Sequence, residues 1–531
     1  MSQQDQQLLQ EINRRRTFAI ISHPDAGKTT LTEKLLLYGG AIRLAGSVKA
    51  RKAQKHAVSD WMEIEKQRGI SVTSSVTQFE YNHYCINILD TPGHQDFSED
   101  TYRTLVAADS AVMLIDAAKG VEEQTIKLFH VCKSRGIPIF TFVNKLDRAG
   151  KDPFLLMEEI ENVLGIRSYP MNWPIGTDGD FKGIYHRDLS MIEVFNGGDH
   201  GQTQVSSQKG SVNDPAFMEL LGLDFHRKLC EDIELLDTAG DAFNLENVLD
   251  GTLTPIFFGS AMTNFGVQSF FDRFLHLTLP PVSRRSNIGI IKPDFSEFSA
   301  FVFKIQANMN PTHRDRIAFM RVCSGRFERG MIVRHVQGNK EIKLAQPQQF
   351  MAQERTMVED AYPGDIIGFF DPGFFRLGDT LCTGNTIFQY EGIPVFAPEH
   401  FARVTTINSM KRKQFIKGIS ELSEEGAIQY FKQVDIGREE LIIGVVGALQ
   451  FEVLEYRLKN EYGVEIRINQ LPFRFVRWIG DAQTEPKHLK LTSSTMIAHD
   501  QKGKMVLFFE NDWSIRWALE NNPNMQLLGI S

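Results

Sequence analysis

The sequence predicts a multidomain α/β protein with three parts in order. These are an α/β domain of the P-loop type, a β-barrel domain, and an α+β ferredoxin-like domain with a C-terminal extension. Three observations predict this order. A glycine-containing loop joins an apolar strand to a helix near residue 25, short strands alternate with glycine turns in the middle, and a βαββαβ pattern follows. The length of 531 residues allows three or four domains.

Composition and charge exclude several classes of protein. The chain is 42% hydrophobic and 23% charged, which is ordinary for a globular protein, and its formal net charge of −8 argues against coating DNA or RNA through bulk charge. The five cysteines are an odd number without a Cys-x-x-Cys pair, so neither a disulfide framework nor a zinc site is indicated. We find no signal-peptide core and no run of 18 apolar residues, so we expect a cytoplasmic protein without membrane contact.

The first predicted elements are a strand at 17–21, a loop at 22–28 and a helix at 30–38. The loop matches the phosphate-binding pattern G-x-x-x-x-G-K-[ST], except that a serine replaces the first glycine. We expect backbone N–H groups to point at phosphate oxygens, Lys28 to contact the β- and γ-phosphates, and the Thr29 hydroxyl to bind Mg²⁺. The loop residues are Ser22, His23, Pro24, Asp25, Ala26, Gly27, Lys28 and Thr29.

The second motif follows an apolar strand predicted at 84–89. It reads Asp90-Thr91-Pro92-Gly93-His94 and falls where the strand ends. Asp90 is suited to hold the water shell of the magnesium ion, and the N–H of Gly93 is suited to contact a γ-phosphate. The motif therefore predicts a loop that senses whether this phosphate is present.

The third motif follows a strand at 111–115, a helix at 122–135 and a strand at 137–143. It reads Asn144-Lys145-Leu146-Asp147. Asp147 can accept both the ring N–H and the exocyclic amine of guanine, a donor pair that adenine lacks. We expect Asn144 to brace the base-binding loops and the stem of Lys145 to cover the base, so the motif predicts binding of GTP and GDP.

A strand at 254–258 and a helix at 267–277 complete the predicted domain. The strand ends at Gly259-Ser260-Ala261, and the backbone N–H groups of Ser260 and Ala261 are placed to reach the guanine oxygen. Asp237-Thr238-Ala239-Gly240 also resembles a D-x-x-G motif. It follows no apolar strand, so we interpret it as a helix end with a glycine stop.

Together these motifs resemble those of the translational GTPases, in order and in spacing. Within that superfamily, the phosphate loop, the stretches 59–71 and 303–309, and the similarity from about Arg14 to Leu471 resemble the bacterial peptide chain release factor 3 family. The resemblance implies that His94 orients the attacking water and that Ser71 binds Mg²⁺ in the GTP state. It also implies that Pro24 and Ile70 form an apolar gate beside His94.

The resemblance also implies a function for a basic segment between the first two motifs. In this family the segment is a switch that lies near ribosomal RNA in the GTP state, which makes phosphate contact a hypothesis for this chain. A solvated charged face is the alternative interpretation. The basic residues are Arg43, Lys49, Arg51, Lys52 and Lys55.

The rest of the chain predicts two further domains. Strands at 301–305, 317–322, 331–336 and 366–370 with glycine turns predict a β-barrel. Strands and helices from 401 to 468 then predict a ferredoxin-like βαββαβ unit. We expect a GTP-binding domain at 1–281 with an insertion at about 170–250, a barrel at 282–396 and the α+β domain at 397–531.

Three functions from different classes remain to be compared. The first, implied by the resemblance, is a ribosome-stimulated GTPase of translation termination that makes class I peptide release factors dissociate from the ribosome after peptide release, without stop-codon specificity. The second is a GTPase that delivers or moves RNA cargo, and the third is a nucleotide-holding scaffold without hydrolysis. The domain order disfavours the second, because elongation factor G has further domains and elongation factor Tu has another all-β domain. His94 disfavours the third.

Overall fold

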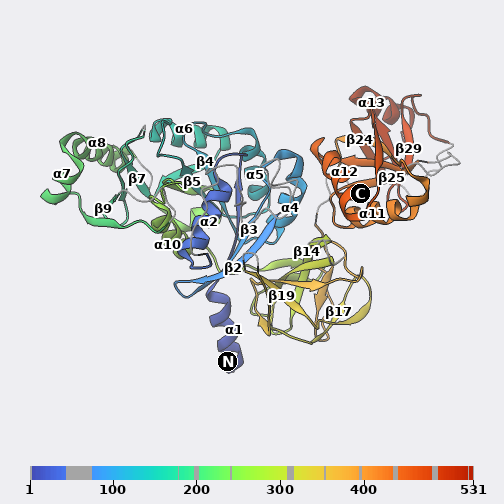
Figure 1. Cartoon of the computed structure of the whole chain (residues 1–531), viewed down its shortest axis with the longest axis horizontal. Coiled ribbons are helices and arrows are strands. Elements are labelled where there is room, and N and C mark those ends of the chain that lie inside the picture. The colour runs from blue at the N-terminus through green and yellow to red at the C-terminus, as the bar shows by residue number, and fades with distance from the viewer. Residues whose placement is uncertain are drawn as a thin grey trace.

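The computed structural model contains the predicted domains in the predicted order. It describes residues 3–42, 74–177, 179–196, 203–239, 242–307, 316–351, 354–393, 397–433, 441–480, 488–523 and 525–529. Figure 1 shows the N-terminal domain at the centre and left, the barrel below it, and the C-terminal domain at the upper right. The fold class predicted from the sequence is confirmed.

The first domain is built on a seven-stranded sheet with the order β2-β3-β1-β4-β5-β11-β6, in which only β2 runs antiparallel to its neighbour. Its central strands are buried along their full length, as expected for a sheet with helices on both faces. The strands are β1 (Arg15–Ser22), β2 (Ser75–Tyr81), β3 (Tyr84–Asp90), β4 (Ser110–Asp116), β5 (Ile139–Asn144), β6 (Arg167–Pro170) and β11 (Leu253–Phe258).

Helices on this sheet form the two halves of the core. A row of phenylalanines on α10 packs against α2 and the strands on one face, and α5 and α6 pack on the other. The helices are α1 (Gln3–Asn13), α2 (Lys28–Tyr38), η1 (Gln95–Phe97), α4 (Ser98–Val106), α5 (Glu123–Ser134), α6 (Pro153–Leu164) and α10 (Val267–Leu277).

An insertion between β6 and β11 forms the left end of the molecule in Figure 1. It holds an antiparallel sheet with the order β10-β9-β8-β7, covered by helices. The Asp237-Thr238-Ala239 stretch is the end of one of these helices, which agrees with the prediction; Gly240 lies outside the described residues. The elements are β7 (Asn172–Ile175), β8 (Gly183–His186), β9 (Met191–Phe195), β10 (Ser207–Ser211), α7 (Pro215–Leu221), α8 (Leu223–Ala239) and α9 (Leu245–Leu249).

The second domain is barrel-like, with the strand order β18-β17-β23-β14-β15-β22-β19-β20 and a separate β16-β21 pair. A short hairpin of β12 (Arg284–Ser286) and β13 (Gly289–Ile291) precedes it. The other strands are β14 (Ser299–Ala307), β15 (Arg316–Ser324), β16 (Phe327–Glu328), β17 (Ile332–His335), β18 (Lys340–Lys343), β19 (Pro347–Met351), β20 (Glu354–Met357), β21 (Asp360–Ala361), β22 (Ile366–Phe370) and β23 (Thr380–Cys382).

The third domain contains the predicted ferredoxin-like unit, with the strand order β27-β24-β26-β25. The C-terminal extension continues this sheet, because β29 pairs with β25 and the order goes on as β29-β30-β28-β31. The elements are β24 (His400–Thr406), η2 (Ser409–Lys411), α11 (Arg412–Glu424), β25 (Gln429–Gln433), β26 (Leu441–Val445), α12 (Leu449–Tyr462), β27 (Ile466–Leu471), β28 (Phe475–Ile479), β29 (Met496–His499), β30 (Met505–Phe509), α13 (Asp512–Asn521) and β31 (Leu527–Leu528).

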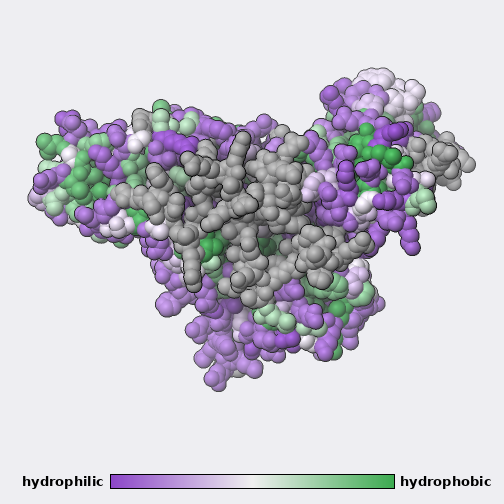
Figure 2. All heavy atoms as spheres, in the orientation of Figure 1, coloured by the Kyte–Doolittle hydropathy of each residue, from purple (hydrophilic) through white to green (hydrophobic). Residues whose placement is uncertain are grey.

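The visible surface is mostly hydrophilic, with apolar patches over the insertion and the third domain (Figure 2). Among the described residues, we find no helix that is both long and apolar enough to cross a membrane. All five cysteines are free thiols, and four of them are buried.

Candidate functional site

The phosphate loop joins the end of β1 to the start of α2, at the carboxyl edge of the sheet. Gly27 caps α2 with φ 100°, a conformation that side chains rarely adopt. A Cβ at this position would also lie 2.3 Å from Asn144 Nδ2, so glycine is required for two reasons. Thr29 occupies the first turn of α2 and is half-buried.

Two polar groups of this loop are buried without a partner among the described residues. Ser22 stands where the phosphate-loop pattern has its first glycine, and its Oγ makes no hydrogen bond. The Nδ1 atom of His23 is also unpartnered, whereas its Nε2 lies 3.3 Å from Glu122 Oε1. Buried polar atoms normally find partners, so these two are consistent with a loop shaped around a polar ligand.

The Asp90–His94 loop lies against the phosphate loop. Lys28 Nζ contacts Asp90 Oδ1, with both side chains buried, and Thr91 Oγ1 donates to the carbonyl of Ile20 at 2.7 Å. A Cβ on Gly93 would meet the backbone of Pro24 at 3.6 Å. The carbonyl of Pro92 accepts a hydrogen bond from Thr101 Oγ1 at 3.2 Å, which ties the loop to α4.

The Asn144–Asp147 motif joins three loops. Asn144 Nδ2 donates to the carbonyl of Ala26 at 2.8 Å, while its Oδ1 accepts from the N–H of Ala261 at 2.8 Å. Ser260 Oγ donates to Asp147 Oδ1 at 2.6 Å, which fixes the carboxylate. The N–H of the buried Leu146 donates to the carbonyl of Gly259 at 3.3 Å.

Lys145 adopts φ 72° and reaches across to the phosphate loop. Its Nζ donates to the carbonyl of Asp25 at 2.5 Å and to Asp116 Oδ2 at 2.7 Å. Burial opposes ionisation of Asp116, but hydrogen bonds from Lys145 and the Ala118 N–H outweigh it and lower the pKa of the carboxyl. Asp116 is not among the residues predicted from the sequence, although its position at the end of an apolar strand was the available signal.

His94 lies at the rim of this site with about a third of its side chain exposed. Its Nδ1 accepts from the N–H of Asp96 at 3.3 Å, and its ring centre lies 6.2 Å from that of Phe97. The imidazole is therefore contacted at Nδ1 and remains partly exposed.

Several predicted residues lie outside the described part of the chain. They include Ser71, Ile70 and the basic segment from Arg43 to Lys55. The first described residue after them is Ser74, which is well anchored. Its N–H donates to Asp100 Oδ2 at 2.6 Å, its Oγ accepts from Thr104 at 2.8 Å, and its carbonyl contacts Lys304 Nζ of the barrel.

These residues fit a guanine nucleotide. The glycine cradle, the buried Lys28 and the helix N-terminus suit phosphates, and Asp147, fixed by Ser260, suits the base. Within the described ranges, no cluster of three or more His, Cys, Asp or Glu could hold a metal ion. A magnesium ion would instead depend on hydroxyl, water and phosphate oxygens, which are the hard ligands that it prefers.

Comparison with known sequences identifies the three domains. The family described as elongation factor Tu GTP binding domain matches residues 13–280, elongation factor G domain 2 matches 297–384, and class II release factor RF3, C-terminal domain, matches 390–519. The peptide chain release factor 3 of Symbiobacterium thermophilum is 62% identical over 98% of both chains. The chain belongs to the peptide chain release factor 3 family. It is therefore a translational GTPase that binds guanine nucleotide and acts in translation termination.

Other relatives agree with this assignment. The peptide chain release factor 3 of a Cyanothece species is 54% identical, covering 98% of this chain and 96% of the relative. That of Gloeothece citriformis is 53% identical, covering 99% and 97%. A crystal structure of a protein from Thermus thermophilus matches with a TM-score of 0.69 at 22% identity, covering 91% of this chain and 72% of that one. This last likeness supports the fold alone.

Proposed function

We propose that this protein is a ribosome-stimulated GTPase that makes class I peptide release factors dissociate from the ribosome after peptide release. Stop codons are read by the class I factor, so this protein acts without codon specificity. The proposal rests on the family, and the observation that carries it is the position of His94. That histidine ends the loop that lies against the phosphate loop, and about a third of its side chain is exposed.

Each motif has a proposed role in binding GTP and GDP. Residues 22–29 hold the phosphates, and Asn144 to Asp147 with Ser260 and Ala261 hold the base. The loop that reports on the γ-phosphate consists of Asp90, Thr91, Pro92, Gly93 and His94. Magnesium, when bound, supplies charge neutralisation between the β- and γ-phosphates. Thr29, Ser71 and, through water, Asp90 are the residues that would hold it. Residues 1–281, 282–396 and 397–531 form the proposed domains.

His94 is the proposed catalytic residue. A water in line with the γ-phosphate has to be oriented, and an imidazole held at Nδ1 presents Nε2 for this purpose. We nominate no arginine of this chain to stabilise the transition state. We therefore expect the isolated protein to hydrolyse GTP slowly and ribosomal RNA to accelerate the hydrolysis. The proposed location of the protein is the cytoplasm.

The test measures GTP turnover with and without ribosomes and follows a fluorescent class I factor on a termination complex. GTP and a non-hydrolysable analogue should both drive dissociation of the factor, and hydrolysis should then release this protein. Absence of ribosome stimulation would indicate a nucleotide-holding scaffold. Stimulated turnover with a class I factor that stays bound would indicate another role in translation.

The same assay tests His94. His94→Ala should lower the ribosome-stimulated rate of GTP turnover by roughly 100-fold or more, because orientation of a reacting water contributes a rate factor of at least this size. Nucleotide affinity should change little, since the proposed role of the imidazole is to orient the water, while the other residues of the motifs hold the phosphates and the base. A stimulated rate within twofold of the unmodified protein would refute the catalytic assignment.

A further inference from the structure

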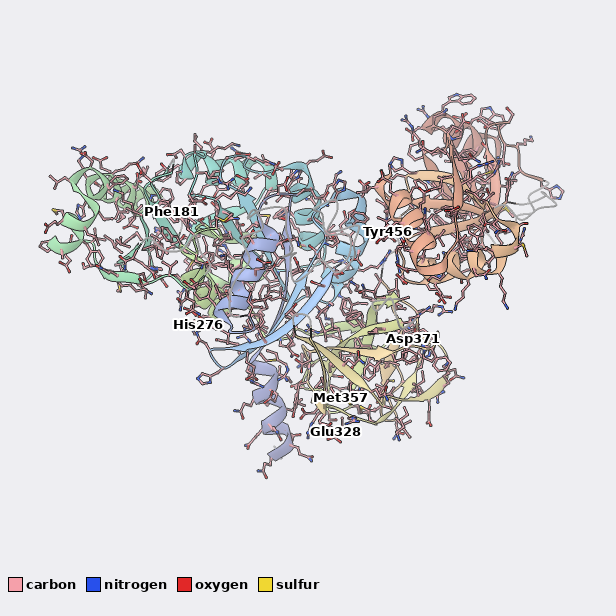
Figure 3. All side chains as sticks on the ribbon, viewed as in Figure 1. Phe181, His276, Glu328, Met357, Asp371 and Tyr456 are labelled. Carbon is pink, nitrogen blue, oxygen red and sulfur yellow. The ribbon has the colours of Figure 1, made fainter. Side chains whose placement is uncertain are left out.

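Asp96, two residues after His94, lies at the contact between the first and third domains. It is part of η1, between the Asp90–His94 loop and α4, and its side chain is only 12% exposed. Figure 1 shows α12 on the side of the third domain that faces α4, and Figure 3 labels Tyr456 of α12 on this side. Asp96 therefore connects the proposed catalytic loop with a separate domain.

Towards the third domain, Asp96 caps a helix. Its Oδ2 accepts a hydrogen bond from the N–H of Leu449 at 2.7 Å, and Leu449 is the first residue of α12. The N-cap residue Ala448 has no side-chain acceptor of its own. A carboxylate at a helix N-terminus satisfies an open N–H group and interacts favourably with the helix dipole. The first domain thus supplies the cap that α12 lacks.

The third domain is shaped for this contact. A Cβ on Gly447 would lie 2.2 Å from Asp96 Cγ and 2.4 Å from Asp96 Cα, so only glycine admits the aspartate here. Gln450 Oε1 accepts from the N–H groups of Val446 and Gly447, at 2.8 and 3.0 Å, and holds the turn before α12. The turn, the glycine and the open N–H of Leu449 together form a socket for Asp96.

Towards the site, Asp96 contacts His94. Its backbone N–H donates to His94 Nδ1 at 3.3 Å, and its Oδ1 lies 3.4 Å from the same atom. Asp96 therefore contacts the Nδ1 edge of the imidazole through both its backbone and its side chain, and its position determines where the ring lies.

From these contacts we propose that Asp96 is a positioning residue, through which docking of the third domain holds His94 in its working orientation. This inference rests on the proposed catalytic role of His94. In the docked state the carboxylate is occupied by α12 and the Asp96 N–H remains on His94. When the third domain moves away, Asp96 in η1 loses its hydrogen bond to the N-terminus of α12, and the imidazole loses its support.

The test compares variants in ribosome-stimulated turnover of GTP by the full-length protein. Asp96→Ala should lower the kcat at saturating ribosomes by at least tenfold, because a misplaced catalytic group loses its orientation. The KM for ribosomes and the Kd for a fluorescent GDP should stay within about twofold. Asp96→Asn should recover most of the rate, since its amide oxygen still caps α12. Asp512→Ala, which removes an exposed acid from the first turn of α13, is the matched control.

A second pair of variants separates positioning from folding. Gly447→Ala should reproduce the loss of kcat by pushing Asp96 away while leaving its side chain present. Combining it with Asp96→Ala should add no further loss, since the two act on one contact. If Asp96→Ala raises only the KM for ribosomes, or lowers the melting temperature with kcat intact, the residue is merely structural and the proposal fails.

His94→Ala makes the two failures distinguishable. If His94→Ala keeps its stimulated rate, the proposed catalytic role fails, whatever Asp96 does. If His94→Ala abolishes the rate while Asp96→Ala and Gly447→Ala keep theirs, only the positioning role is overturned.

Discussion

At the scale of single residues, Asn144 determines how well two loops of the site are joined. Its amide bridges the carbonyl of Ala26 and the N–H of Ala261, and the side chain is 2% exposed. Asn144→Ala leaves both groups without this partner, at about 1–3 kcal/mol each. We expect at least tenfold weaker binding of fluorescent GDP and a lower melting temperature. Asn460→Ala on the exposed face of α12 is the control, and unchanged GDP binding in Asn144→Ala would contradict the bridge.

Asp147 is the residue proposed to select guanine over other bases. Its carboxylate is fixed by Ser260 Oγ at 2.6 Å, in an orientation that can accept two hydrogen bonds from guanine. Asp147→Asn replaces one acceptor by a donor, so we expect roughly 100-fold weaker GTP binding and a gain in XTP binding. Competition titrations with both nucleotides measure the effect. An unchanged preference for GTP over XTP would count against this role.

Individual residues differ in how far the sequence predicts them. Lys28, Asp90 and Asn144 can be predicted as site residues, because each belongs to a motif that follows an apolar strand. The carboxyl ends of parallel strands meet at one edge of the sheet. Asp116 ends such a strand too, but no motif marks it. The role of Asp96 cannot be predicted from the sequence, since its partner Leu449 lies in another domain and no local pattern links the two residues.

At the scale of elements, the insertion is joined to the first domain through Glu193 on β9. Burial would raise the pKa of Glu193, but hydrogen bonds from His186, Ser269 and Ser207 lower it to about 2. Ser269 belongs to α10, so the ionised carboxylate ties the insertion to the main core. A lowered pKa means that this stabilisation is complete above pH 4.5 and is lost as the pH falls towards 2.

Glu193→Gln should therefore destabilise the insertion by about 3 kcal/mol at neutral pH. Hydrogen exchange of β8, β9 and β10 at pH 7 and pH 3 measures it. The variant should exchange faster at pH 7 and show less acid dependence than the unmodified protein. Glu246→Gln, at an exposed position of α9, is the control, and equal exchange in both variants would refute the link.

Elements with a clear local period are well predicted. The helix at 267–277 has the predicted bounds, because its apolar face is buried. The strands after residue 471 are not predicted. They are two to five residues long and complete the sheet through the pairing of β29 with β25, a contact distant in sequence. The β12-β13 hairpin is not predicted either, because each of its strands is only three residues long.

At the scale of the whole molecule, the three domains are joined in two different ways. The barrel is held on the first domain by buried ion pairs, Arg15 with Asp365 at 2.8 Å and Arg321 with Asp109 at 2.5 Å. The third domain meets the first through Asp96 and through Arg103, which donates to the carbonyls of Glu425 and Gly426. Both residues follow the loop that would sense the γ-phosphate, so we infer that the second contact is coupled to nucleotide.

This arrangement predicts which domain moves. Exchange of GDP for a non-hydrolysable GTP analogue should shift the third domain relative to the first while the barrel stays in place, because buried ion pairs are costly to break. Exposed positions for paired spin labels are Leu155 on α6, Ile332 on the barrel and Trp513 on α13. Cys230 is the thiol to remove first, since the other four are buried.

The 155–513 distance should change between the two nucleotides, and the 155–332 distance should not. Arg103→Ala should weaken the dependence of the 155–513 distance on nucleotide, because it removes two hydrogen bonds that connect α4 with the third domain. Arg227→Ala, at an exposed position of α8, is the control. A change confined to the 155–332 distance would mean that the barrel, despite its buried ion pairs, is the part that responds to nucleotide.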